Sequence, residues 1–124
     1  MSSQETQDRW DAIYGGHRSV GQPDSFVTTS EFLPSPPATA VDLAGGTGAT
    51  ALWLAANEYQ VSLVEISEVA IRVAKAEAVR RGLQLSTVHH DLESSKQLLD
   101  RWDVAICCNF LDRSLYPLLR NYVT

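Results

Sequence analysis

The chain has 124 residues, enough for one domain built around one hydrophobic core. Apolar residues make up 44% of it and charged residues 20%, a balance that excludes disordered and fibrous proteins. The formal net charge of -5 argues against a surface that binds nucleic acid by neutralising its phosphates. We therefore expect a single domain over residues 1–124.

The cysteines and the N-terminus favour a cytoplasmic protein. Cys107 and Cys108 are adjacent in an apolar run, so we expect them to be small buried side chains rather than a disulfide or nucleophiles. The first ten residues are polar and lack the apolar region of a secretion signal. No apolar run is long enough to span a membrane. The sequence thus predicts a soluble protein of the reducing cytoplasm.

Residues 1–40 are expected to form an N-terminal helical extension. The pattern over residues 6–14 predicts a short helix, which the pair Gly15–Gly16 would end. Trp10 and Tyr14 on this helix have two interpretations. They are either a hydrophobic contact that fixes the helix, or an aromatic lid over a bound ligand.

The N-terminal extension is expected to contain a second short helix, which Asp24 or Ser25 would cap and which would carry Phe32. A regular alternation of strands and helices follows over residues 41–124. The expected elements are a strand over 39–43, a helix over 49–58, a strand over 60–66, a helix over 68–81 capped by Ser67, a strand within 83–90, a helical turn over 94–100, a strand over 104–110 and a helix over 114–123. This alternation predicts an α/β fold, a Rossmann-like doubly wound parallel sheet with helices on both faces.

The most informative segment is residues 41–48, Val-Asp-Leu-Ala-Gly-Gly-Thr-Gly. A glycine-rich turn between a strand and a helix lets the backbone approach a ligand and points the helix N-terminus at it. The run from Gly46 to Ala51 satisfies the dinucleotide-binding pattern, with Glu65 placed to bind ribose hydroxyls. The alternative is a turn that needs glycine only for its own conformation.

Three carboxylates are expected at one edge of the sheet. Asp42, Glu65 and Asp91 come at the ends of the first three strands, and the carboxyl ends of parallel strands share the edge where such folds bind ligands. Asp42 would repel the pyrophosphate of a nicotinamide dinucleotide but attract an ammonium group. Together the carboxylates suit a ligand with an ammonium, ribose hydroxyls and an adenine amino group. S-adenosylmethionine has all three.

The segments around these residues resemble those of class I S-adenosylmethionine-dependent methyltransferases. The resemblance rests on residues 41–48, Val64–Ser67, His90–Glu93 and Trp102–Ile106. Within that class, Arg9–Tyr14 and Phe110–Pro117 resemble the small bacterial branch that includes the tellurite-resistance methyltransferases. The resemblance implies S-adenosylmethionine as the cofactor, and it implies that Gly46 and Gly48 wrap the methionine moiety beside Asp42.

The same resemblance assigns the rest of the site. It implies that Glu65 binds the ribose, that Asp91 and the backbone of Leu92 contact the adenine, and that Asn109 borders the methyl group. The full set of implied cofactor-binding residues is Tyr14, Asp42, Ala44, Gly45, Gly46, Gly48, Glu65, Ile66, Asp91, Leu92 and Asn109. The chain departs from the family at Ala44, where the first glycine of the motif usually stands, and at Gly45, where cysteine is common.

The expected activity is methyl transfer to a small molecule. No residue is a clear general base, so the catalytic residue stays unassigned and the acceptor is expected to be a thiol or a chalcogen oxyanion. The pair His89–His90 does not predict a metal site, because adjacent residues of a strand point to opposite faces. The alternative function is a non-catalytic S-adenosylmethionine-binding module, or a truncated subunit completed by dimerisation.

A homodimer is expected from the strand order. The family's sheet has seven strands, and this sequence has patterns for four, in the implied order 3-2-1-4, as if truncated after the fourth strand. That strand is apolar on both faces and would lie at an edge, which invites pairing with a second chain. We expect two copies to associate through the fourth strand and the last helix, with no nucleic-acid or membrane partner.

Overall fold

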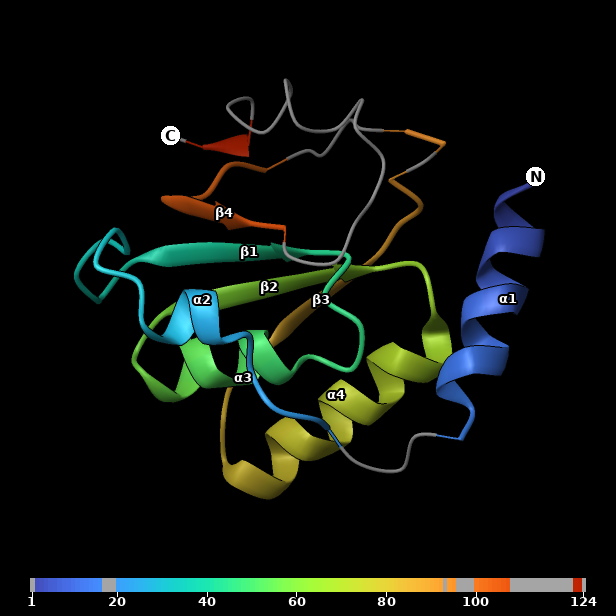
Figure 1. The fold of residues 1–124 in the computed structure, drawn as a ribbon, viewed down its shortest axis with the longest axis horizontal. Coiled ribbons are helices and arrows are strands. Elements are labelled where there is room, and N and C mark those ends of the chain that lie inside the picture. The colour runs from blue at the N-terminus through green and yellow to red at the C-terminus, as the bar shows by residue number, and fades with distance from the viewer. Residues whose placement is uncertain (1, 17–19, 93, 96–99, 108–121, 124) are drawn as a thin grey trace.

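The computed structural model describes residues 2–16, 20–92, 94–95, 100–107 and 122–123 (Figure 1). In chain order, its elements are α1 (Ser3–Tyr14), α2 (Ser25–Thr28), β1 (Thr39–Leu43), α3 (Ala49–Ala56), β2 (Gln60–Glu65), α4 (Glu68–Arg81), β3 (Ser86–His89) and β4 (Val104–Ile106). No helix in these ranges is long and apolar enough to cross a membrane.

The four strands form one parallel sheet in the order β3-β2-β1-β4. Val41 of β1 lies opposite Ser62 of β2 on one side and Ala105 of β4 on the other. The prediction of a Rossmann-like doubly wound sheet with this strand order is therefore confirmed. Figure 1 shows α1 at the end of the sheet where β1 and β2 terminate, while α2, α3 and α4 lie together on one face.

The core consists of two apolar clusters, one on each face of the sheet. Side chains from α2, α3 and α4 form the first with Ala40, Val61, Leu63 and Ile106. The second cluster consists of Val41, Leu43, Val64, Leu92, Trp102 and Tyr122. Successive strand residues point to opposite faces, so β1 supplies both clusters and is buried from Ala40 to Leu43.

Local capping sets the limits of α4. The Ser67 side chain accepts a hydrogen bond from the Ala70 N–H, and Gly82 ends the helix in the left-handed conformation at φ 69°. These limits confirm the predicted helix over residues 68–81. Gly48 precedes α3 at φ 87° without a side-chain cap, and α3 ends at Ala56, before the predicted limit at 58.

Other predicted limits change in the structure. α1 begins at Ser3, because the Ser2 side chain caps it, rather than at residue 6. α2 has only 4 residues, so Phe32 lies beyond it and is 91% exposed. β4 covers Val104–Ile106, the first part of the strand predicted over 104–110. Most of that strand's second half, most of the turn over 94–100 and residues 114–121 of the predicted helix over 114–123 lie outside the described residues. At the end of that predicted helix, Val123 forms a β-bridge with Trp102, so the prediction of helix is wrong there.

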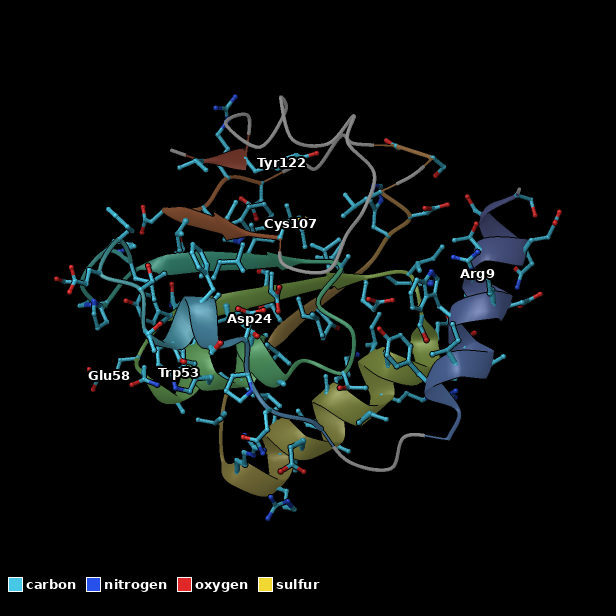
Figure 2. All side chains as sticks on the ribbon, in the orientation of Figure 1. Arg9, Asp24, Trp53, Glu58, Cys107 and Tyr122 are labelled. Carbon is cyan, nitrogen blue, oxygen red and sulfur yellow. The ribbon has the colours of Figure 1, made fainter. Side chains whose placement is uncertain are left out.

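The outer edge of the sheet is partly covered by the chain itself. The Trp102 N–H donates to the Tyr122 carbonyl at 2.7 Å, and Trp102 and Val123 form a parallel bridge. Tyr122 is buried in the second cluster, with the half-buried Cys107 packed against that cluster (Figure 2). This pairing lies just before β4, and in the described ranges β4 itself is the outermost strand of the sheet.

Candidate functional site

A cavity of about 680 Å³ opens at the end of the sheet where β1, β2 and β3 terminate, a volume typical of ligand pockets. The turn after β1 and the start of α3 form one wall, and the ends of β2 and β3 form another. Helix α1 and part of the segment before α2 complete it. The lining residues are Thr6, Arg9, Trp10, Tyr14, Gly21, Gln22, Asp24, Ala44, Gly45, Gly46, Thr47, Ala49, Thr50, Val64, Glu65, Ile66, His90, Asp91 and Leu92.

The glycine turn lies too close to its neighbours to carry side chains. A Cβ on Gly45 would lie 2.3 Å from Leu63 Cδ1 and 2.5 Å from Asp42 Oδ2. Gly46 has φ 62°, and a Cβ there would lie 2.8 Å from the Tyr14 hydroxyl. The turn therefore presents bare backbone to the cavity, as a site that holds a ligand against the main chain requires.

Gly48 lies behind the wall of the cavity, against α4. It does not line the cavity, and a Cβ on it would lie 2.9 Å from the Ala74 Cβ on α4. Its φ of 87° also requires glycine. Gly48 thus allows α3 to pack closely on α4, which aims the start of α3 at the cavity.

Glu65 is a buried carboxylate joined to the glycine turn. Its Oε1 accepts from the Gly46 N–H at 2.9 Å and its Oε2 accepts from the Ser67 N–H at 2.8 Å, and the side chain is only 4% exposed. Burial raises the pKa of Glu65, against the opposing effect of these backbone hydrogen bonds. Each carboxylate oxygen can accept a further hydrogen bond, so Glu65 retains capacity toward the cavity.

Asp42 lies beneath the turn rather than in the cavity wall. It is 3% exposed, and within the described part of the chain its Oδ2 has no hydrogen-bond partner. Burial and then the charge of Glu65 raise the pKa of Asp42 to about 7. Asp42, which the resemblance places beside the methionine moiety directly or through water, thus lies one layer below Gly45.

Asp91 and Leu92 line the cavity at the end of β3. The Ser3 hydroxyl of α1 donates to Asp91 Oδ2 at 2.8 Å. The Leu92 side chain is buried in the second core cluster, so its backbone is held in place at the cavity. Ile66 lines the same wall one residue after Glu65.

Helix α1 brings aromatic and charged groups over the cavity. Trp10 and Tyr14 stack with ring centroids 5.8 Å apart, and the Arg9 guanidinium lies 5.5 Å from the Trp10 ring. Burial and the charge of Glu65 raise the pKa of Tyr14. Figure 2 places Arg9 on α1 and Asp24 near the start of α3, where the Asp24 N–H donates to Thr50 Oγ1 at 3.0 Å. This geometry favours the aromatic lid over the alternative interpretation of Trp10 and Tyr14.

The two histidines of the third-strand region contact backbone carbonyls. His89 Nε2 lies 2.7 Å from the Ile66 carbonyl, and His90 Nε2 lies 2.7 Å from the Ser95 carbonyl. In the described ranges, no group of three or more His, Cys, Asp or Glu side chains has the arrangement of a metal site.

A family model described as a methyltransferase domain matches residues 40–122. The chain belongs to this family of methyltransferase domains. The match begins in β1 and includes the glycine turn, Glu65 and Asp91, which together form the cavity walls. The predicted membership of the methyltransferases is confirmed.

Solved structures share the fold of this methyltransferase domain. One, from work on the conversion of a disulfide bond into a thioacetal group during echinomycin biosynthesis, is 25% identical with a TM-score of 0.69, over 85% of this chain and 48% of that chain. A Geobacter sulfurreducens methyltransferase in complex with S-adenosyl-L-homocysteine is 18% identical with a TM-score of 0.73, over 94% of this chain and 51% of that chain. TehB from Haemophilus influenzae is 17% identical with a TM-score of 0.70, over 94% of this chain and 42% of that chain.

This methyltransferase domain thus spans about half the length of these structures. At the identities of the last two, the likeness shows the fold alone. No curated protein sequence matches the chain.

Most of the predicted site residues of the methyltransferase domain meet at the cavity. Tyr14, Ala44, Gly45, Gly46, Glu65, Ile66, Asp91 and Leu92 line it. Asp42 and Gly48 lie behind its wall, and Asn109 lies outside the described residues. Sequence reasoning missed Thr6, Arg9, Gln22, Asp24, Thr47 and Thr50 as lining residues. Thr47 and Thr50 belong to the run from Gly46 to Ala51 that the sequence pattern indicated, and Asp24 belongs to a predicted cap. Thr6, Arg9 and Gln22 reach the cavity through the tertiary position of the N-terminal segment.

Proposed function

We propose that this domain binds S-adenosylmethionine in the cavity and transfers its methyl group to a small molecule. The observation that carries the proposal is the junction of Glu65 with the glycine turn. There a buried carboxylate and a side-chain-free backbone form adjoining walls at the carboxyl edge of a parallel sheet. The methyltransferase family match and the structures in complex with S-adenosyl-L-homocysteine support the choice of cofactor.

The charges and spaces of the cavity fit this cofactor. The bare backbone at Gly45 and Gly46 leaves room for the methionine moiety, and the partnerless Oδ2 of Asp42 lies beneath it, where a nearby ammonium would stabilise the ionised carboxylate. Glu65 would accept from the ribose hydroxyls, and Asp91 from the adenine amino group. A dinucleotide fits less well, because its pyrophosphate would face Asp42.

The residues of the chain position the reactants. When bound, S-adenosylmethionine supplies a methyl group on a positively charged sulfur, activated for in-line displacement. Glu65 and the glycine turn would fix the orientation of the bound molecule, and Trp10 and Tyr14 would exclude water from above. Positioning and water exclusion are the contributions that such a displacement requires from the protein.

The acceptor we propose is a thiol or a chalcogen oxyanion. Such acceptors ionise without a dedicated general base. His90 is the one histidine among the described lining residues, and its Nε2 already lies 2.7 Å from the Ser95 carbonyl. Arg9 supplies a positive charge at the cavity, which favours an anionic acceptor.

A second candidate is a non-catalytic S-adenosylmethionine-binding module, or a subunit completed by dimerisation. The described lining residues form a binding cavity, and none of them is assigned as catalytic, which favours this candidate. For either candidate we propose a homodimer in which two copies pair through β4 and the helix predicted over residues 114–123, most of which lies outside the described residues, with each cavity near the interface. Within the described part of the chain, Val104–Ile106 pairs with β1 alone, which leaves its other edge for such a contact.

Two experiments separate these candidates. Calorimetric titration with S-adenosylmethionine, S-adenosylhomocysteine and NAD tests the cofactor, and we expect the first two to bind and NAD not to bind. A methyl-transfer assay over thiols, selenite, tellurite, amines and phenols then tests activity. Transfer to thiols or oxyanions supports the first candidate. Tight binding without transfer to any acceptor supports the second.

A further inference from the structure

Helix α1 is attached to the domain mainly through polar contacts. Thr6 is its one buried residue among those described, and Ile13 is 47% exposed. An apolar stripe therefore does not explain why this helix lies over the carboxyl edge of the sheet. Two hydrogen bonds, one near each end of the helix, attach α1 to the groups around the cavity, and each leads to one of the two carboxylates in the cavity wall.

The first attachment is Asp11. Its Oδ1 accepts from the Ser67 hydroxyl at 2.5 Å and from the Val69 N–H at 3.3 Å. Ser67 is fully buried, and its own N–H donates to Glu65 Oε2. Because Glu65 Oε1 accepts from the Gly46 N–H, a continuous hydrogen-bonded path joins α1 to the glycine turn.

The charge state of Asp11 suits a side chain that accepts hydrogen bonds from Ser67 and Val69. Burial raises the pKa of Asp11, but hydrogen bonds from Ser67, Val69 and Gln7 and the charge of Arg72 outweigh it, so the pKa lies below its ordinary value. Asp11 is thus an anion at neutral pH. It lies at the N-terminus of α4, where a negative charge is favourable.

The second attachment is Ser3, whose hydroxyl donates to Asp91 Oδ2 at 2.8 Å. Ser3 lies on the first turn of α1 and Asp11 on its last turns, so one rigid helix contacts the supports of both carboxylates.

We propose that α1 positions the carboxylates for the adenosine half of the cofactor, with Asp11 acting on Glu65 through Ser67 and Ser3 acting on Asp91 directly. This inference rests on the proposed function for its ligand. Asp11 and Ser3 are positioning residues, since neither lines the cavity. The arrangement makes adenosine recognition depend on a helix that precedes the sheet by more than twenty residues.

The test is calorimetric titration of S-adenosylhomocysteine into the whole chain and its variants. Asp11→Ala should weaken binding roughly tenfold and Ser3→Ala roughly threefold, in keeping with the loss of one charged and one neutral hydrogen bond. Asp11→Asn retains an acceptor for the Ser67 hydroxyl and should bind within about threefold of the parent. Asp8→Ala is the matched control, because Asp8 is an exposed residue of the same helix that accepts a hydrogen bond from Gln4 within that helix. We expect this variant to bind as the parent does.

A double-variant cycle distinguishes positioning from a merely structural role. In a Glu65→Gln background, Asp11→Ala should change affinity by less than about twofold, because its effect passes through Glu65. A tenfold loss in both backgrounds would mean that Asp11 only stabilises the fold, and would overturn the proposal. So would an Asp11→Ala variant that binds as the parent does.

A ligand-free measurement separates this proposal from the proposed function. Amide hydrogen exchange of the parent and of Asp11→Ala reports on the Gly46 and Ser67 N–H groups, which Glu65 holds. Faster exchange at both groups, with unchanged exchange in β1, supports the positioning path even if no S-adenosylhomocysteine binds to the parent. Unchanged exchange at Gly46 would overturn it.

Discussion

Replacing Asp42 with asparagine should make the stability of the domain less dependent on pH. Asp42 is fully buried, and burial and the charge of Glu65 raise its pKa from 3.8 to about 7. The Asp42 carboxyl therefore binds its proton more tightly in the folded state than in the unfolded state. The contribution of Asp42 to the unfolding free energy falls as the pH rises from 3.8 to about 7. Asparagine has nearly the same shape and does not titrate.

The magnitude follows from the shift. About three pKa units correspond to about 4 kcal/mol of unfolding free energy, lost progressively between pH 4 and pH 7. Between pH 5 and pH 8, the contribution of Asp42 falls by roughly 2 to 3 kcal/mol. The free energy of the parent minus that of Asp42→Asn should fall by this amount, because the other titrating groups are common to both proteins.

The assay is urea unfolding of both proteins at pH 5, 6, 7 and 8, followed by circular dichroism. The two curves of unfolding free energy against pH should converge or cross as the pH rises, because the variant becomes more stable relative to the parent. A difference between parent and variant that stays constant within about 0.5 kcal/mol from pH 5 to pH 8 would refute the reasoning. Asp42 would then be ionised across this range despite its burial.

Three further predictions concern two residues of the site, Glu65 and Gly46, and the glycine that ends α4, Gly82. Glu65→Ala should weaken S-adenosylhomocysteine binding by about 1.5–3 kcal/mol in calorimetry, because a charge-assisted contact to the ribose is lost, and unchanged affinity would contradict its assignment. Gly46→Ala should lower both the affinity and the urea midpoint, because Gly46 has φ 62° and its new Cβ would lie 2.8 Å from the Tyr14 hydroxyl. Adding Tyr14→Phe should recover part of the loss in urea midpoint, and no recovery would exclude this contact as the cause. At Gly82 there is open space for a Cβ, but the backbone has φ 69°. We therefore expect Gly82→Ala to lose about 1 kcal/mol of unfolding free energy with no change in affinity. An equal loss in the free energy of binding would contradict this prediction.

The parts of the fold set by local chemistry could be predicted from the sequence. The limits of α4 follow from a serine cap and a terminal glycine, and β1 is an apolar run with turn residues after it. Limits that depend on packing could not be predicted in the same way. Phe32 has the apolar character of a buried helix residue, yet it is 91% exposed beyond the short α2.

The same difference between local patterns and tertiary packing applies to the candidate site. Glu65 and Asp91 could be placed together because the carboxyl ends of parallel strands share an edge. The contact of Asp11 with Ser67 spans 56 positions and depends on how α1 docks, for which no local pattern exists. Gly48 shows a related limit, since sequence alone cannot separate a glycine needed for a ligand from one needed for packing on Ala74.

The central claim is that the cavity beside Glu65 binds S-adenosylmethionine. Calorimetric titration of S-adenosylhomocysteine into the parent, Glu65→Ala and the distant control Asp8→Ala tests it most directly. We predict one site per chain in the parent and in Asp8→Ala, with affinity reduced at least tenfold in Glu65→Ala. Absence of binding to the parent, or equal affinity in all three proteins, would contradict the claim.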